Sequence, residues 1–303
     1  MRSGELTIAT AMANLCNLDG SILPEDEARV PVLDRGFLFG DSVYEVVRTT
    51  AGVPFGWPEH FARLRTSAAA IRLELDLDDR ELARRVDATV RAAAHGDSYV
   101  RIIATRGSGS APNIGLAYAP GPPRWVVLVR PAPDVRGHPA RIALVQRLRN
   151  DRRALDPATK SGNYLNNVLA LAEAQAAGAT DCVMANADGN VTEASTANLF
   201  VLLGGVWCTP PLEAGLLAGV TRGLLLGFLR GSSAAVEERN VTAGDLARAD
   251  EIFLSSTLRE ISPVTHLDGR ELHGGGPGPQ TAALAERFAA HCAALLRETY
   301  APR

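Results

Sequence analysis

The segment PAPDVRGHPA, residues 131–140, divides the sequence into two parts that each have their own strand and helix patterns. Proline and glycine at this density interrupt both helices and strands, so the segment is predicted to be a linker. A chain of 303 residues usually forms about two domains. We therefore expect a small N-terminal α/β domain over 1–130, an interdomain linker over 131–140 and a larger C-terminal domain over 141–303.

Both parts mix alternating and helical hydrophobic patterns, which indicates an α+β fold. In the first part, strands are expected within 39–52, 98–107 and 124–131, with a helix over 57–73 whose first turn holds Pro58. In the second part we expect a strand over 141–146, a helix from Asn163 to Ala177 closed by Gly178, and a run of antiparallel strands over 181–209. A glycine-bearing turn that opens into a helix is expected over 214–231, two strands over 250–269, and a final helix from Thr281 to Glu298.

The composition excludes several classes of protein. With 46% hydrophobic residues, 21% charged residues and a net charge of -3, the chain has the profile of a globular protein, and it has no basic tract for nucleic acid. No apolar run reaches the length of a membrane span, and the N-terminus does not resemble a signal peptide. The histidines lack metal-ligand spacing, so no metal is expected. The unpaired spacing of the four cysteines, Cys16, Cys182, Cys208 and Cys292, favours reduced thiols in a cytoplasmic protein.

Lys160 is the one lysine among the 31 Lys and Arg residues, which leaves 30 arginines. Arginine can replace lysine in ion pairs and on solvated surfaces. It cannot replace lysine as a nucleophile, because the guanidinium stays protonated while a buried ammonium can lose its proton. An activated lysine forms Schiff bases with a substrate carbonyl or with pyridoxal phosphate. The retained lysine is therefore either a chance survivor on the surface or a catalytic amine, and its neighbours in the sequence have to decide between the two.

Pyridoxal phosphate requires more than a lysine, and the sequence offers each further feature. AGVTRG places Gly219, Val220 and Thr221 at a helix N-terminus, where backbone N–H groups bind phosphate. The SST segment at 255–257 supplies hydroxyl groups, and TEASTANLF places Glu193 where an acid could pair with the pyridine nitrogen. A Lys-dependent aldolase would not need such a phosphate site.

Taken together, the segments TKSGNYLNNVLA, DGNVTEASTANLF, GLLAGVTR and EHFARL resemble the fold-type IV pyridoxal-phosphate enzymes in order and spacing. This family includes branched-chain aminotransferases, D-amino acid aminotransferases, (R)-amine transaminases and aminodeoxychorismate lyases. The resemblance implies a two-domain α+β fold with the cofactor between the domains, usually assembled as a homodimer. It implies that Lys160 holds the cofactor covalently and moves the proton, that Tyr164 binds the phenolic oxygen and that Glu193 binds the pyridine nitrogen. By the same resemblance, the phosphate is bound by Arg63, Gly219, Val220, Thr221, Ser256 and Thr257.

The substrate is less well specified by the sequence. Candidate pocket residues are Tyr44, Val46, Arg48, Tyr99, Arg101 and Leu258. YVR at 99–101 resembles the Tyr-Ile-Arg-Pro of branched-chain enzymes, although Ile102 replaces the proline and Ser256-Thr257 replaces Gly-Thr. GDSVYEVV and SST look more like the D-amino acid enzymes, but the loop RGSGSAPNIGLAY lacks their Arg-x-His motif. Arg106 in that loop is a further candidate carboxylate ligand.

These observations favour a transaminase that moves an amino group between an amino acid and a 2-oxo acid by a ping-pong mechanism. The branched-chain type is the first expectation, D-amino acid or (R)-amine transamination the second, and an aminodeoxychorismate lyase the third. A pyridoxal-phosphate-binding protein without turnover is disfavoured, since both Lys160 and Glu193 are present. The expected partners are a small amino donor and a keto acceptor.

Overall fold

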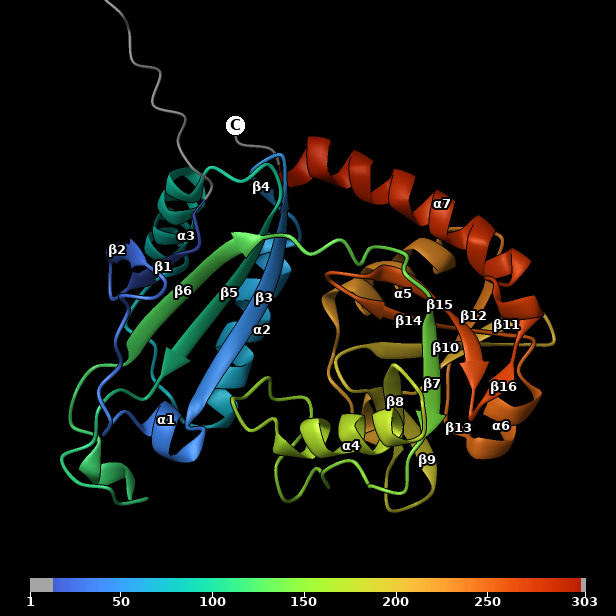
Figure 1. The fold of residues 1–303 in the computed structure, drawn as a ribbon, viewed down its shortest axis with the longest axis horizontal. Coiled ribbons are helices and arrows are strands. Elements are labelled where there is room, and N and C mark those ends of the chain that lie inside the picture. The colour runs from blue at the N-terminus through green and yellow to red at the C-terminus, as the bar shows by residue number, and fades with distance from the viewer. Residues whose placement is uncertain (1–12, 301–303) are drawn as a thin grey trace, which may run out of the picture.

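A computed structural model describes residues 13–300 and contains two β-sheets, one on each side of residues 132–139 (Figure 1). The six-stranded sheet has the order β2-β1-β6-β5-β3-β4 and precedes this segment. Its strands are β1 (Leu15–Leu18), β2 (Ser21–Pro24), β3 (Ser42–Thr50), β4 (Val53–Pro54), β5 (Ser98–Thr105) and β6 (Arg124–Pro131). The helical elements in this part are α1 (Arg35–Phe39), α2 (Trp57–Ala70), α3 (Asp79–Ala93) and the short 3-10 helix η1 (Leu116–Tyr118).

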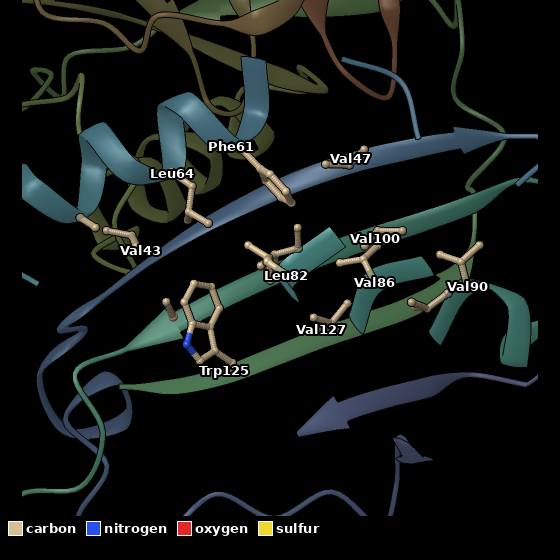
Figure 2. Packing of buried hydrophobic residues seen from close by; sticks show 14 of the residues in the cluster. Val43, Val47, Phe61, Leu64, Leu82, Val86, Val90, Val100, Trp125 and Val127 are labelled. Carbon is tan, nitrogen blue, oxygen red and sulfur yellow. The ribbon is translucent and has the colours of Figure 1, made fainter. Parts of the chain in front are cut away.

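Helices α2 and α3 pack on one face of the first sheet (Figure 2). Because side chains alternate along a strand, Val43, Glu45 and Val47 of β3 are buried on the α2 side. Tyr44 and Val46 then point to the opposite face, toward the second sheet, and line the cavity between the two sheets. The strand alternation thus decides which side chains reach the site.

The second sheet is mixed and has the order β12-β11-β10-β14-β15-β7-β8-β9-β13, with β16 paired to β15. Its strands are β7 (Ala140–Leu144), β8 (Asp181–Ala185), β9 (Asn190–Ala194), β10 (Asn198–Leu203), β11 (Val206–Thr209), β12 (Ala235–Glu238), β13 (Val241–Thr242), β14 (Glu251–Ser256), β15 (Glu260–Leu267) and β16 (Arg270–Glu271). The helical elements are α4 (Leu165–Ala176), α5 (Val220–Arg230), α6 (Ala243–Arg248), α7 (Pro279–Leu295), the 3-10 turns η2 (Leu212–Ala214) and η3 (His273–Gly275), and the π-helical turn η4 (Leu296–Tyr300).

A second core lies where α5 and α7 cover strands β10 and β14. Phe200 and Phe253 stack there with ring centroids 4.8 Å apart, and Phe288 of α7 is buried in the same cluster. A further cluster lies between α4 and β8. Helix α7 crosses the top of this half of the molecule in Figure 1. These contacts hold α4, α5 and the end of β14 in place around the cavity.

Three expectations from the sequence need correction. Helix α4 begins at Leu165 and not at Asn163, because Gly162 and Asn163 form the turn that follows Lys160. The strands within 181–209 form the expected antiparallel hairpins, β8–β9 and β10–β11, but β9 and β10 are not neighbours in the sheet. Helix α3 was not expected, although its N-cap Asp78 accepts a hydrogen bond from Glu81 N, and Leu82, Val86 and Val90 form a buried stripe.

Candidate active site at the junction of the two sheets

A cavity of about 470 Å³ lies between the two sheets, and side chains from both parts of the chain line it. From the first part come Tyr44, Val46, Arg63, Tyr99 and Arg101. From the second come the predicted cofactor residues Lys160, Tyr164, Glu193, Gly219, Val220, Thr221, Ser256 and Thr257, together with Leu258. Segments that are far apart in the sequence therefore meet in one place, as the motif analysis predicts.

Lys160 lies at the boundary between the two parts of the molecule. Its backbone N–H donates to Ser67 Oγ at 3.0 Å, and its carbonyl accepts from Tyr44 N at 3.0 Å. Its Nζ lies 4.5 Å from the centre of the Tyr44 ring. Burial and the nearby Arg63 guanidinium lower the pKa of Lys160 to about 8. This amine therefore loses its proton about two pH units below an ordinary lysine, as a nucleophile requires.

Two tyrosines lie beside the lysine. Tyr164, the N-cap residue of α4, packs edge-on against Tyr44 with ring centroids 5.5 Å apart. Burial raises the pKa of both phenols, so each stays protonated as a potential hydrogen-bond donor. Arg101 stacks over the Tyr44 ring at 4.0 Å. The Tyr44 ring therefore contacts both the Lys160 amine and the Arg101 guanidinium.

Glu193 of β9 is held by four donors. Arg149 donates from Nε to Glu193 Oε1 at 3.0 Å and lies equally close through Nη2. On the other oxygen, Oε2 accepts from Leu217 N at 3.1 Å and from Asn198 Nδ2 at 3.4 Å. Both members of the ion pair are buried, with less than a tenth of each side chain exposed. The ion pair and the two further hydrogen bonds fix the carboxylate at the cavity wall.

The N-terminus of α5 opens toward the cavity. Its N-cap residue Gly219 provides no capping side chain, so the first N–H groups, those of Val220 and Thr221, are free to bind an anion. A Cβ at Gly219 would come within 2.0 Å of Asn198 Oδ1, so only glycine fits there. Ser255 Oγ is buried in the same wall without a hydrogen-bond partner. Free amides, hydroxyl groups and a guanidinium are the donor set that a phosphate ester needs, so the residues fit pyridoxal phosphate.

Arg63 connects this wall to the first sheet. It donates to both oxygens of Glu45 at 2.7 Å and, through Nη1, to the carbonyl of Ala218 at 3.0 Å. His60 Nδ1 lies 2.7 Å from the same Glu45 carboxylate. Burial alone would raise the pKa of Glu45, but the hydrogen bonds from Arg63 and His60 outweigh it and lower the pKa to about 2. The carboxylate is therefore ionised, and it orients Arg63 toward α5.

Most of the predicted substrate residues also line the cavity. Tyr44, Val46, Tyr99, Arg101 and Leu258 line it, next to Pro133 and Val135 of the segment between the sheets. Arg48 does not line it, because Arg48 lies further along β3 and pairs with Asp97 at 3.2 Å.

Arg106 does not line the cavity either. Asp41 accepts from it at 2.8 and 3.0 Å, and the carbonyls of Ile71 and Arg72 accept from two further N–H groups. The structure therefore gives this arginine a structural ion pair.

Several site residues were not singled out from the sequence. Arg149, Glu45 and His60 act through their contacts with predicted residues, and Arg259 lines the cavity while donating to Asp181 at 2.7 Å. The signal that could have found Glu45 and His60 is the strand parity of β3 together with the position of His60 three residues before Arg63 on α2. Within residues 13–300, no group of three or more His, Cys, Asp or Glu side chains is arranged to hold a metal ion.

Comparison with known proteins agrees with this geometry. The model of the amino-transferase class IV family matches residues 42–267, so the chain belongs to the class IV aminotransferases. These enzymes use pyridoxal 5′-phosphate and have the two-domain α+β fold described above.

Individual relatives are similar over almost the whole chain. A Methanocaldococcus jannaschii protein named "Putative branched-chain-amino-acid aminotransferase" is 36% identical over 89% of this chain and 94% of its own length. The D-alanine aminotransferase of Bacillus licheniformis is 33% identical over 87% of this chain and 92% of its own. The crystal structure of the branched-chain aminotransferase of Thermoproteus uzoniensis with norvaline has a TM-score of 0.85 and 32% identity, covering 94% of this chain and 96% of that one.

Proposed function

We propose that this enzyme transfers the amino group of a branched-chain amino acid to a 2-oxo acid. The observation that carries the proposal is that Arg101 lines the cavity together with a set of apolar side chains. Within residues 13–300, no carboxylate forms an ion pair with Arg101, which stacks over the Tyr44 ring. A free guanidinium can bind a substrate carboxylate, and the apolar wall, formed by Val46, Tyr99, Pro133, Val135 and Leu258, suits an aliphatic side chain.

The roles of the cofactor residues are part of the proposal. Bound pyridoxal phosphate supplies the electron-accepting ring that stabilises negative charge on the substrate carbon. Lys160 Nζ binds the cofactor and carries the proton that moves during transamination. Glu193 would bind the pyridine nitrogen, and Tyr164 would donate to the phenolic oxygen. Arg63, the amides of Val220 and Thr221 next to Gly219, and the segment Ser256–Thr257 would hold the phosphate.

A D-amino acid is the second candidate substrate, and a specific feature favours it. The segment between β14 and β15 carries Ser256 and Thr257, which resemble the D-amino acid enzymes more than the branched-chain ones. The similarity to the Bacillus licheniformis D-alanine aminotransferase, at 33% identity, supports the same alternative. The two candidates differ in the side of the cofactor on which the substrate carboxylate lies.

We also infer a homodimer and a cytoplasmic location, and we propose that the domain boundary lies at 131–140. Phe37 and Ile114 are about three-quarters exposed, and Arg35 joins their segments by donating to the Ile114 carbonyl at 2.9 Å. A second copy of the chain would cover this apolar surface.

The four buried free cysteines suit a reducing compartment. Among the described helices, none is long and apolar enough to cross a membrane. Light scattering on the purified protein tests the dimer.

A half-reaction screen tests the substrate. The loaded enzyme is mixed with L-leucine, L-glutamate, D-alanine, D-glutamate or (R)-1-phenylethylamine without an acceptor, and the absorbance of the aldehyde form is followed. Loss of that absorbance with L-leucine and L-glutamate supports the branched-chain assignment. Conversion by the D-compounds or the (R)-amine alone overturns it, and regeneration of the aldehyde form without acceptor indicates a lyase. Borohydride reduction and peptide mass analysis test the attachment to Lys160.

A further inference from the structure

The charged cluster behind the proposed phosphate site contains a histidine that the transfer reaction does not require. His60 of α2 and Glu45 of β3 are both completely buried, and His60 Nδ1 lies 2.7 Å from Glu45 Oε2. An ionised carboxylate only accepts hydrogen bonds, so Nδ1 of His60 carries a proton directed at Glu45. The tautomer of the ring is thereby fixed, and the second nitrogen, Nε2, is free to titrate.

That second nitrogen faces the other sheet. His60 Nε2 lies 3.5 Å from Thr257 Oγ1, at the outer limit of a hydrogen bond. Thr257 follows β14 and lines the cavity near Arg63 and Val220. While His60 is neutral, Nε2 can only accept, so the Thr257 hydroxyl points its proton at the histidine. Once Nε2 is protonated it donates to Thr257, and the hydroxyl proton is free to turn to a ligand in the cavity.

We propose that binding of the cofactor's phosphate group is coupled to the uptake of one proton by His60, which turns the Thr257 hydroxyl toward the phosphate. The inference rests on the proposed placement of the phosphate beside Arg63, Val220 and Thr257. The proton comes from solvent and adds to the Nε2 lone pair. Nε2–H then donates to Thr257 Oγ1, and Thr257 O–H donates to a phosphate oxygen. No bond between heavy atoms forms or breaks.

The charges that face His60 keep the ring neutral until a further negative charge arrives. Glu45 from β3 carries one negative charge, Arg63 from α2 balances it, and Lys160 approaches from the segment before α4. Burial lowers the pKa of His60, as do the charges of Arg63 and Lys160, although Glu45 acts in the opposite sense. The ring is therefore neutral near pH 7 in the structure described here. A phosphate dianion would add two negative charges beside it and favour the imidazolium.

Calorimetry on the full chain freed of cofactor measures this proton directly. Pyridoxine 5′-phosphate and pyridoxine are used as ligands, because neither has an aldehyde to condense with Lys160 and they differ only in the phosphate. Titration at pH 7.5 in buffers of different ionisation enthalpy gives the number of protons taken up by each complex. We expect the phosphorylated ligand to take up about 0.5 to 1 proton more than pyridoxine does.

Three variants make the assignment specific. H60Q should abolish the extra proton uptake and weaken pyridoxine 5′-phosphate about tenfold, while leaving pyridoxine unchanged. T257V removes the hydroxyl that contacts His60 Nε2 and leaves the His60–Glu45 pair in place, so it provides a second test if H60Q fails to fold. D41N is the matched control, because Asp41 is a carboxylate of the same domain that pairs with Arg35 and Arg106 away from the cavity. Its proton count should equal that of the wild type.

The outcomes separate this inference from the proposed function. If the phosphorylated ligand binds no better than pyridoxine, the phosphate is not where we place it and the proposed cofactor residues are wrong. If it binds much more tightly but with the same proton count, or if H60Q keeps the extra uptake, the phosphate site stands and the role of His60 is refuted.

Discussion

The cavity residues proposed to bind the cofactor, here called the cofactor end, and those proposed to bind the substrate, the substrate end, differ in how their charges are balanced. At the cofactor end, Arg63 pairs with the buried carboxylate of Glu45 and Arg149 with that of Glu193. At the substrate end, Arg101 lies over the Tyr44 ring and, in the described part of the chain, has no acidic partner. Paired groups are held in one geometry before any ligand arrives, whereas an unpaired guanidinium is stabilised by the ligand it binds.

This difference indicates a division of roles. A cofactor that stays bound through many turnovers is served by a rigid, preorganised end. The amino donor and the keto acceptor bind one after the other, and the carboxylate of each can neutralise the unpaired charge of Arg101. Substitutions at the cofactor end should therefore affect all substrates equally, and substitutions at the substrate end should discriminate among them.

The largest effect is expected from Lys160→Arg, which keeps a positive side chain and removes the titratable amine. Because guanidinium does not lose its proton, we expect transamination to fall at least about 10⁴-fold for every amino donor. Since Lys160 is the one lysine in the sequence, borohydride treatment should leave no pyridoxyl-labelled peptide. Activity within tenfold of the wild type would contradict the role of the lysine.

A smaller uniform effect is expected from Glu193→Gln. The amide keeps the shape of the side chain but loses the charge that faces the proposed pyridine nitrogen, so kcat should fall about 10²–10³-fold. The fall should be the same for L-leucine and L-glutamate. The matched control is Glu25→Gln, which removes a carboxylate from an ion pair with Arg130 outside the cavity and should leave kcat unchanged. If the fall in kcat in Glu193→Gln differed between substrates, Glu193 would have to be assigned to substrate binding and not to cofactor binding.

The residues that the sequence reveals are those whose chemistry is rare for their surroundings. Lys160 is the lone lysine in an arginine-rich chain, and Gly219 stands at a helix start that only glycine fits. Arg149 and His60 were not visible, because an arginine or histidine in the sequence does not show which carboxylate it will meet. Their partners, Glu193 and Glu45, lie 44 and 15 residues away. Packing creates these pairs.

The alternation of side chains along a strand also predicts only part of the site. It correctly places Tyr44 and Val46 on the cavity face of β3, and by the same rule it places Arg48 there. Parity gives the face of the sheet but not where the cavity ends, and Arg48 lies beyond that end beside Asp97. Most of the long elements follow the hydrophobic patterns. Helix α3 was missed because its capping residue Asp78 lies within a run of acidic residues that obscures the signal, and short elements such as β1, β2, α1 and α6 were also not expected.

Arg101→Gln should sharpen the comparison between the two ends. Losing a hydrogen bond to a charged carboxylate costs about 1.5–3 kcal/mol, so kcat/KM should fall about 10–100-fold for amino acids. An amine without a carboxylate should lose nothing. Arg101→Lys should restore part of the activity as a point charge. Steady-state kinetics with L-leucine and with a simple amine check this. An equal loss for both donors would mean that Arg101 supports the site and does not bind substrate.

The smallest effect concerns the pH at which the enzyme takes up its cofactor, and it tests the boundary between the two ends. Lys160 contacts Tyr44 from the substrate end, and Arg63 from the cofactor end lowers its pKa to about 8 after burial. A lowered pKa means that the neutral amine forms earlier as pH rises, so the rate of reloading with pyridoxal phosphate should rise about tenfold between pH 7 and pH 9 and then level off. An ordinary lysine would give a rate that keeps rising past pH 10.

Stopped-flow absorbance on the cofactor-free chain measures this rate. Arg63→Gln should shift the midpoint of the pH profile to higher pH, because it removes the neighbouring positive charge. A midpoint that does not move in Arg63→Gln would leave burial as the whole cause of the shift, and the cofactor end would then have no electrostatic influence on the amine.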